Sequence, residues 1–293
     1  MILRRTCCAW AAAIAVVGMA VVPARAVVVG GPVSDYSTYN AAPTSDFPSF
    51  NYVGTMNGAS GVYLGNGYVI TAGHVGPGNF TLKNYSTNTT TTYSRDTSFA
   101  TVQLQDPFSS DKVADLVIFR LAGTLPNLRP LTIAPTIANS GTSLYFGGNG
   151  LTRGSEVTGL GYNVLSSNSL HFGANTVVGP SSFSTTTTNI MRGFRTLFDS
   201  TPGSTQAING DSGGGVFSSG TVNGQNILQG IMLAINTLPG QPGGTVYYGD
   251  TTYAADLSYY RSQINAIVPE PAMLGFLGVF GLLSLQRKRA QRS

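Results

Sequence analysis

The sequence predicts an all-β protein, and three observations support that prediction. The 293 residues include 37 glycines but only 10% charged residues, a composition typical of turn-rich globular proteins and poor in solvated helices. Short apolar or alternating runs recur between clusters of Gly, Asn, Pro and Ser, as in antiparallel strands joined by tight turns. No amphipathic helix of about 15 residues is evident before residue 254.

Six segments show the strand-like pattern. They are 61–64, 68–70, 115–121, 143–146, 227–235 and 245–248. The stretch 254–268 instead has apolar residues at roughly helical spacing, which predicts a terminal helix. Two polar stretches, 86–92 and 181–189, contain too little apolar surface for a core and are predicted to be exposed loops or hairpin tips.

The N-terminus has the features of a secretory signal peptide. Arg4 and Arg5 precede the apolar run 9–22, and the small residues Ala24 and Ala26 follow it. We expect cleavage by signal peptidase after Ala26. The alternative is a membrane anchor, but the 14 apolar residues of 9–22 fall short of the roughly 20 that span a bilayer as a helix.

The C-terminus combines Pro-Glu-Pro at 269–271, an apolar run at 272–285 and a basic cluster at 287–292. An apolar segment followed by positive charges halts translocation, because moving the charges across hydrocarbon is costly. This order resembles the PEP-CTERM sorting signal. The resemblance implies processing by an exosortase and delivery to the cell surface or extracellular matrix of a Gram-negative bacterium, with membrane contact only through the tail before processing. A plain C-terminal anchor is the alternative.

The basic overall charge is a property of the two ends. Seven of the 16 basic residues lie in 1–26 and 287–292, whereas 27–268 holds eleven of the 12 acidic residues and nine basic ones. This near-neutral body has no cationic stripe for phosphate backbones, so we expect no nucleic-acid partner. Both cysteines, Cys7 and Cys8, lie in the signal peptide, and only two histidines occur. We therefore expect no disulfide, no metal site and no cofactor.

Two segments place a reactive residue at the end or start of an apolar strand. His74 ends the run 69–75, and imidazole suits general-base work because its ordinary pKa is close to neutrality. Asp115 opens the apolar strand 115–121, where a buried carboxylate needs a donor. A histidine N–H would serve, although a turn-capping Asp and a packing His are the structural alternatives.

The sharpest signal is Asn-Gly-Asp-Ser-Gly-Gly-Gly at 209–215. Glycines on both sides of Ser212 allow a tight turn and let main-chain N–H groups approach a reacting carbonyl. The Ser212 hydroxyl would be the nucleophile, and the N–H groups of Gly210 and Ser212 would form the oxyanion hole. A glycine-rich turn without catalysis is the alternative.

Together the three segments resemble the trypsin/chymotrypsin-like serine peptidases, in which they occur in this chain order. The resemblance covers 28–268. It implies two antiparallel six-stranded β-barrels, with the triad of His74, Asp115 and Ser212 in the cleft between them. We accordingly expect a signal peptide at 1–26, a first barrel at 27–135, a second barrel with the terminal helix at 136–268, and the sorting tail at 269–293. The substrate would be a polypeptide.

Two further roles follow from the resemblance. The segment 28–31, Val-Val-Gly-Gly, looks like the mature start of such enzymes, whose free N-terminus pairs with the Asp beside the serine. That residue is Asp211, although cleavage after Ala26 leaves one extra residue, Val27. Gln206 occupies the position of the specificity-pocket floor, so preference for Lys or Arg at the cleaved bond is not expected.

Other readings remain open at this point. The rival to a peptidase is a non-catalytic surface or matrix protein on a peptidase-like fold. An esterase or lipase could use the same triad, but 210–213 lacks the Gly-x-Ser-x-Gly turn of such enzymes. His171 has no motif around it and is read as structural or surface-exposed.

Overall fold

The computed structural model describes residues 27–31, 43–184 and 189–269. The predicted signal peptide and most of the sorting tail lie outside these residues. Within them the all-β prediction is confirmed, with a single α-helix near the C-terminus. The part of the chain described holds no helix that is both long and apolar enough to span a bilayer.

The first half of the chain forms an antiparallel sheet of seven strands. In spatial order they are β6 (Thr89–Tyr93), β5 (Phe80–Asn84), β2 (Val53–Met56), β3 (Ala59–Gly65), β4 (Tyr68–Ala72), β8 (Val113–Arg120) and β7 (Val102–Gln105). The sheet differs from the expected six-stranded first barrel, because it has a seventh strand and its edges β6 and β7 do not pair within the described residues.

The extra strand lies in the polar stretch 86–92, which the sequence predicts to be an exposed loop or a hairpin tip. Threonines 89–92 are exposed, so they bury no apolar face, but β-branched side chains favour extended backbone. They pair with β5, and only the tip of the hairpin, 85–88, is a turn.

The second half of the chain forms a closed six-stranded barrel, as predicted. Around the barrel the strands are β12 (His171–Ser184), β13 (Ile190–Leu197), β18 (Thr251–Asp256), β16 (Gln225–Asn236), β15 (Gly215–Val222) and β9 (Ser143–Gly148). Of the polar stretch 181–189, residues 181–184 belong to β12 and pair with 190–193 of β13, whereas 185–188 lie outside the described residues. All six segments predicted as strands lie within or overlap observed strands.

The predicted helix 254–268 begins later than expected. Ala254 and Ala255 pair with Phe194 and Gly193, so they complete the barrel as part of β18. The 3-10 turn η2 (Leu257–Tyr259) and helix α2 (Arg261–Ile267) follow. Barrel closure, a long-range effect, therefore overrides the local helical pattern at the start of this stretch.

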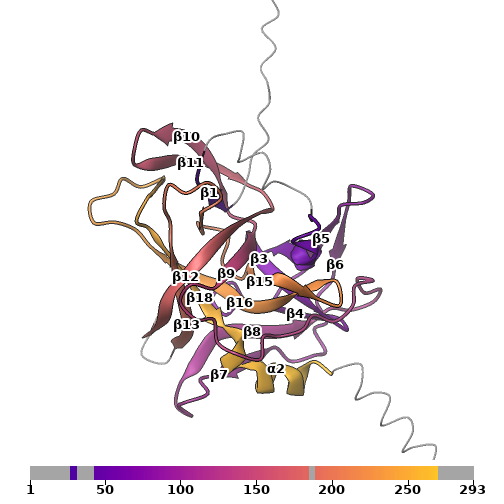
Figure 1. Cartoon of the computed structure of the whole chain (residues 1–293). Helices are drawn as coiled ribbons and strands as arrows, with labels where there is room; N and C mark the ends of the chain where they lie inside the picture. Colours follow the sequence, from indigo (N-terminus) through magenta and orange to yellow (C-terminus); the bar gives the residue numbers. More distant parts are fainter. Residues whose placement is uncertain (1–26, 32–42, 185–188, 270–293) are drawn as a thin grey trace, which may run out of the picture.

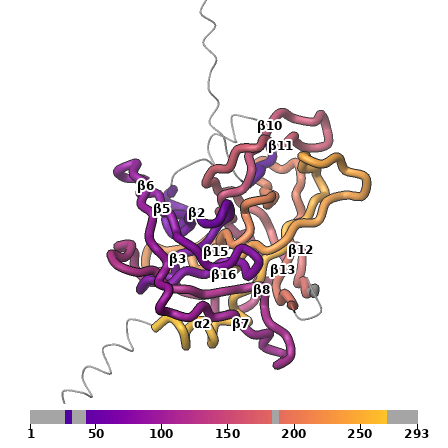
Figure 2. The backbone as a smooth tube through the Cα atoms, turned by 180° about the vertical axis from the view of Figure 1, so that it is seen from behind, coloured from indigo at the N-terminus to yellow at the C-terminus, as the bar shows by residue number. Residues whose placement is uncertain are grey.

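Smaller elements complete the molecule. They are the pair β1 (Val28–Val29) and β14 (Thr205–Gln206), the sheet β10 (Leu151–Val157), β11 (Gly161–Asn168) and β17 (Thr245–Tyr247), and the 3-10 turn η1 (Pro48–Tyr52). Figures 1 and 2 place the β10–β11 hairpin at one end of the molecule and α2 at the other.

Aromatic residues join the two halves. Phe47 and Phe50 precede β2 and are fully buried. The ring of Phe47 lies 5.2 Å from that of Phe172 in β12 and 5.1 Å from that of Phe217 in β15, measured between centroids. Offset and edge-to-face contacts of this kind add to the free energy gained by burial. The first sheet and the barrel are thus packed against each other around one shared core.

Candidate active site

His74 and Asp115 are brought together by the pairing of β4 with β8. The last pair of this ladder is Ala72 with Leu116, so the chain beyond it lies beside Asp115. Gly73 N–H donates to the Asp115 carbonyl at 3.0 Å, and His74 N–H donates to Asp115 Oδ1 at 2.9 Å. Asp115 Oδ2 lies 2.7 Å from His74 Nδ1. The β4–β8 register and these hydrogen bonds together hold the His74 imidazole against the Asp115 carboxylate.

The environment of this pair suits proton transfer. The Asp115 side chain is 6% exposed, whereas 47% of the His74 side chain is open to solvent. The hydrogen bond that His74 donates to Asp115 raises the pKa of His74, and partial burial of the ring opposes that rise. A carboxylate on Nδ1 fixes the tautomer that leaves Nε2 free to accept a proton.

Gly73, the residue before His74, has no room for a side chain. A Cβ added there would lie 2.7 Å from Asp115 Oδ1, closer than real Cβ contacts allow. The residue before the histidine is therefore restricted to glycine unless the carboxylate moves.

Ser212 lies in a tight turn that packs on β4. Its carbonyl accepts from Ser60 N–H at 3.0 Å, and Gly213 N–H donates to the Met232 carbonyl at 2.8 Å. Gly213 has a φ of +83°, and a Cβ there would overlap Thr71 and Ser60. The turn that carries the serine thus contacts the strand that leads into His74.

Two main-chain carbonyls in this turn are held in place by hydrogen bonds. The Asn209 carbonyl accepts from Leu151 N–H at 2.9 Å, and the Asp211 carbonyl accepts from Gly214 N–H at 2.8 Å. Because a trans peptide directs its N–H opposite its C=O, these two bonds also fix the directions of the Gly210 and Ser212 N–H groups. These are the two donors expected to form the oxyanion hole.

Ser60 helps to hold this geometry and was not singled out from the sequence. Its hydroxyl donates to the Gly210 carbonyl at 2.8 Å and accepts from Asn149 N–H at 2.8 Å, and the residue is fully buried. A lone serine in a strand carries no sequence signal, so only the packing of the two halves identifies it.

Asp211, the residue before the serine, is buried with no exposed surface. Its carboxylate accepts from Gly150 N–H at 2.7 Å and from Ile208 N–H at 2.8 Å. A third main-chain hydrogen bond comes from Val27, itself fully buried. Burial raises the pKa of the Asp211 carboxyl to about 7, against the opposing effect of these hydrogen bonds. The structure places Val27, rather than Val28, against this group.

Gln206 is buried in β14, where it pairs with Val28. Its Oε1 accepts from Thr252 Oγ1 at 3.1 Å. Its Nε2 is buried and has no hydrogen-bond partner among the described residues. An amide donor in this position is costly to leave unpaired, so a ligand that accepts a hydrogen bond there would be favoured.

His171 begins β12, opposite Gly148, and is 3% exposed. It is therefore a buried residue of the barrel and not a surface residue. The described residues contain no group of three or more His, Cys, Asp or Glu side chains arranged to hold a metal ion.

Comparison with known proteins identifies the family. The sequence model of the trypsin family matches residues 38–255, about three quarters of the chain. No protein in the curated collection of characterised sequences matches.

Solved structures share the fold at low sequence identity. A mutant of human heparin binding protein (CAP37) is 18% identical with a TM-score of 0.50, covering 79% of this chain and 95% of that one. The inactive form of the protease Rv3671c of M. tuberculosis is 14% identical with a TM-score of 0.48, covering 83% of this chain and 98% of that one. A likeness at 18% identity shows the fold and does not decide the activity.

Proposed function

Because the chain belongs to the trypsin family, we propose that it is a serine endopeptidase in which His74, Asp115 and Ser212 form the catalytic triad. The hydrogen bond of 2.7 Å between His74 Nδ1 and Asp115 Oδ2 is the observation that carries the proposal. This bond orients the exposed imidazole of His74, which follows β4. The turn that carries Ser212 packs against the same strand. A non-catalytic surface protein needs neither feature.

The proposed reaction is acyl transfer in two steps. Ser212 Oγ attacks the peptide carbonyl carbon while His74 Nε2 takes the hydroxyl proton, and the oxygen that becomes negative accepts hydrogen bonds from Gly210 and Ser212 N–H. The imidazolium, stabilised by Asp115, then gives its proton to the leaving amine as the C–N bond breaks. Water, deprotonated by His74, releases the acyl group from Ser212 and restores the hydroxyl.

We also propose that the chain is exported and sorted to the cell surface or extracellular matrix. Support comes from the sequence: the leader 1–26 for signal peptidase and the tail 269–293 for an exosortase-type enzyme. Mass spectrometry of the protein recovered from the surface fraction tests this. It should begin at Val27 and lack the basic C-terminus, and an intact chain in the cytoplasmic fraction would contradict it.

A fluorophosphonate probe tests the activated serine directly. The mature chain 27–293 in mild detergent should be labelled, and Ser212→Ala and His74→Ala should each abolish labelling. Ser140→Ala, at an exposed serine, is the matched control and should label normally. Folded protein that never labels would favour the non-catalytic alternative.

Peptide and ester substrates separate the two hydrolase readings. A peptidase should cleave an unstructured polypeptide and leave long-chain fatty esters intact. The reverse result would assign the same triad to an esterase.

A further inference from the structure

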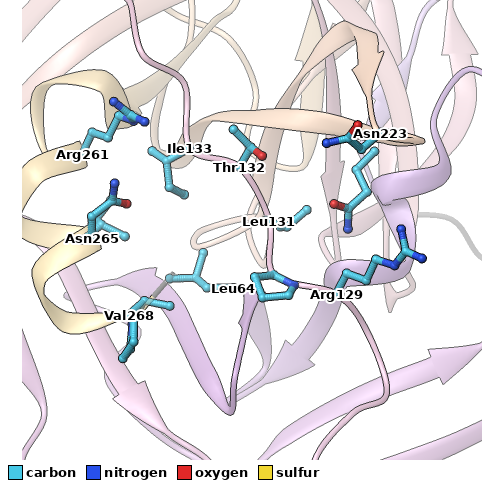
Figure 3. Close-up of a pocket in the computed structure, with 13 residues that line it drawn as sticks. Leu64, Arg129, Leu131, Thr132, Ile133, Asn223, Arg261, Asn265 and Val268 are labelled. Carbon is cyan, nitrogen blue, oxygen red and sulfur yellow. The ribbon is translucent and has the colours of Figure 1, made fainter. Parts of the chain in front are cut away.

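A pocket of about 690 Å³ lies far from His74, between the two halves of the molecule and α2 (Figure 3). The pocket is lined by the end of β3, the segment 129–133 between the two halves of the chain, the β15–β16 turn and α2. Leu64, Leu131 and Ile133 give it an apolar floor. The proposed peptidase activity does not use this pocket.

The charges around the pocket are of one sign. Arg129 and Arg261 line it from two sides, together with Asn223, Gln225 and Asn265, and no Asp or Glu is among the lining residues (Figure 3). Among the described residues neither arginine takes part in an ion pair. The Nε of Arg261 is shielded from solvent and has no hydrogen-bond partner in that part of the chain. A shielded arginine N–H group without an acceptor favours binding of a carboxylate beside it.

The chain itself leads into this pocket. Helix α2 ends with Val268 N–H donating to the Ile264 carbonyl at 2.8 Å, and Pro269 then lines the pocket. The Pro269 carbonyl accepts from Asn66 Nδ2 at 2.8 Å. Asn66 lies in the tight β3–β4 turn with a φ of +54°. The exit point of the tail is therefore fixed at the mouth of the pocket.

The next residue is Glu270, the one acidic residue between 257 and 293. We propose that the pocket is a carboxylate site whose occupant is the chain's own Pro-Glu-Pro segment, 269–271, with Glu270 attracted by the positive charges of Arg129 and Arg261. Pro271 disfavours helical backbone at Glu270, which keeps the segment extended, and its ring suits the apolar floor. Charge complementarity and the short tether, one residue from a fixed position, favour this occupant over a separate acidic partner.

Such docking would determine which way the catalytic cleft faces when the chain is attached through its tail. Asn66 precedes β4 and His74 follows it, so the tail is held at the opposite end of a strand that is about 15 Å long. A chain attached through its tail would present His74 and Ser212 away from the surface that holds it.

Disulfide trapping tests the proposal, because the mature chain 27–293 contains no cysteine. Pro271→Cys is combined with Thr132→Cys, an exposed position lining the pocket. The matched control combines Pro271→Cys with Thr158→Cys, an exposed position near the tip of the β10–β11 hairpin, at the other end of the molecule. In mild detergent under weak oxidation, the pocket pair should close at least about tenfold faster than the control pair.

The charge requirement is tested in the same chain. Glu270→Gln, or Arg129→Gln with Arg261→Gln, should slow closure of the pocket pair by about fivefold or more, and 1 M salt should do the same. Arg195→Gln, at an arginine that does not line the pocket, should have no effect. Fluorophosphonate labelling of Ser212 checks each variant for correct folding, and trapping remains readable even if labelling fails.

Two results would overturn the proposal. Equal closure rates for the pocket and control pairs would show that the segment does not dock. Fast closure that ignores Glu270 and both arginines would reflect the tether alone and not a carboxylate site.

Discussion

The main-chain nitrogen of Val27 hydrogen bonds to the buried carboxylate of Asp211, next to the candidate nucleophile. Val27 is also the first residue expected after signal-peptide cleavage. In an uncut chain this nitrogen is a neutral peptide N–H, whereas cleavage would make it an ammonium. The same contact would then become an ion pair that neutralises Asp211, which the described residues otherwise supply only with neutral donors.

A chain that retains Ala26 should therefore be impaired in a pH-dependent way. Burial places the pKa of Asp211 near 7, above its ordinary value, so the folded extended chain binds this proton more tightly than the unfolded chain. The contribution of Asp211 to the stability of this chain should be greatest below about pH 4 and should fall as pH rises to about 7. Thermal melts of the extended and Val27-start chains at pH 5 and pH 8 measure this, with a larger deficit expected at pH 8.

Asp211→Asn in the extended chain is the control, since it removes the titrating group and should abolish the pH-dependent deficit. Fluorophosphonate labelling at pH 8 should likewise be slower in the extended chain. Equal melts and equal labelling for both N-termini would show that the Val27 contact is structural only.

Labelling of Ser212 should rise with pH. His74 must be neutral to act as a base, and its hydrogen bond to Asp115 raises its pKa, so the midpoint should lie above about 6.5. Asp115→Asn removes that cause, so the midpoint should move down while the maximal rate falls by about 10³–10⁴-fold. The measurement is the labelling rate between pH 5 and pH 9. An unchanged midpoint in Asp115→Asn would contradict the assignment.

Gly73→Ala should reduce activity through the position of Asp115. The added methyl would lie 2.7 Å from Asp115 Oδ1, so the carboxylate or the backbone has to move away from His74. We expect a loss of labelling of about tenfold or more, because small misplacements of catalytic groups are costly. Gly179→Ala, where an added Cβ meets nothing within 4 Å, is the matched control and should retain activity.

Gln206 should set the preference at the cleaved bond. Its buried Nε2 offers a hydrogen-bond donor and no negative charge, so peptides with acceptor side chains should be cut better than those with Lys or Arg. Gln206→Asp should raise kcat/KM for Lys and Arg peptides relative to the others. A peptide library digested by both proteins measures this, and an unchanged profile would place the pocket floor elsewhere.

The Arg192–Asp106 ion pair should contribute to stability. Asp106 follows β7 and Arg192 belongs to β13, and two hydrogen bonds of 2.9 Å join them across the two halves. The guanidinium lowers the pKa of Asp106, so this stabilisation is present above the ordinary carboxyl range and is lost as pH falls below it. Asp106→Asn should cost about 3 kcal/mol in chemical unfolding at pH 7. Exposed Asp111→Asn should change stability little.

The sequence by itself determined the class of fold and the candidate triad. Period-two apolar runs identify strands because alternate side chains of a strand face one core, and that signal is local. Glycines around Ser212 mark a turn for an equally local reason, since only glycine adopts a positive φ without strain. His74 and Asp115 stand out because each places a polar group at the end or the start of an apolar run.

Only the tertiary structure decided how these pieces combine. The β4–β8 register brings His74 to Asp115, and packing of the two halves places Ser60 against the Gly210 carbonyl. The contact of Val27 with Asp211 and the pocket beside Pro269 likewise join segments that are distant in sequence. Such relations depend on strand register and on which surfaces are buried together. Both are settled by the free energy of the whole fold and not by any local pattern.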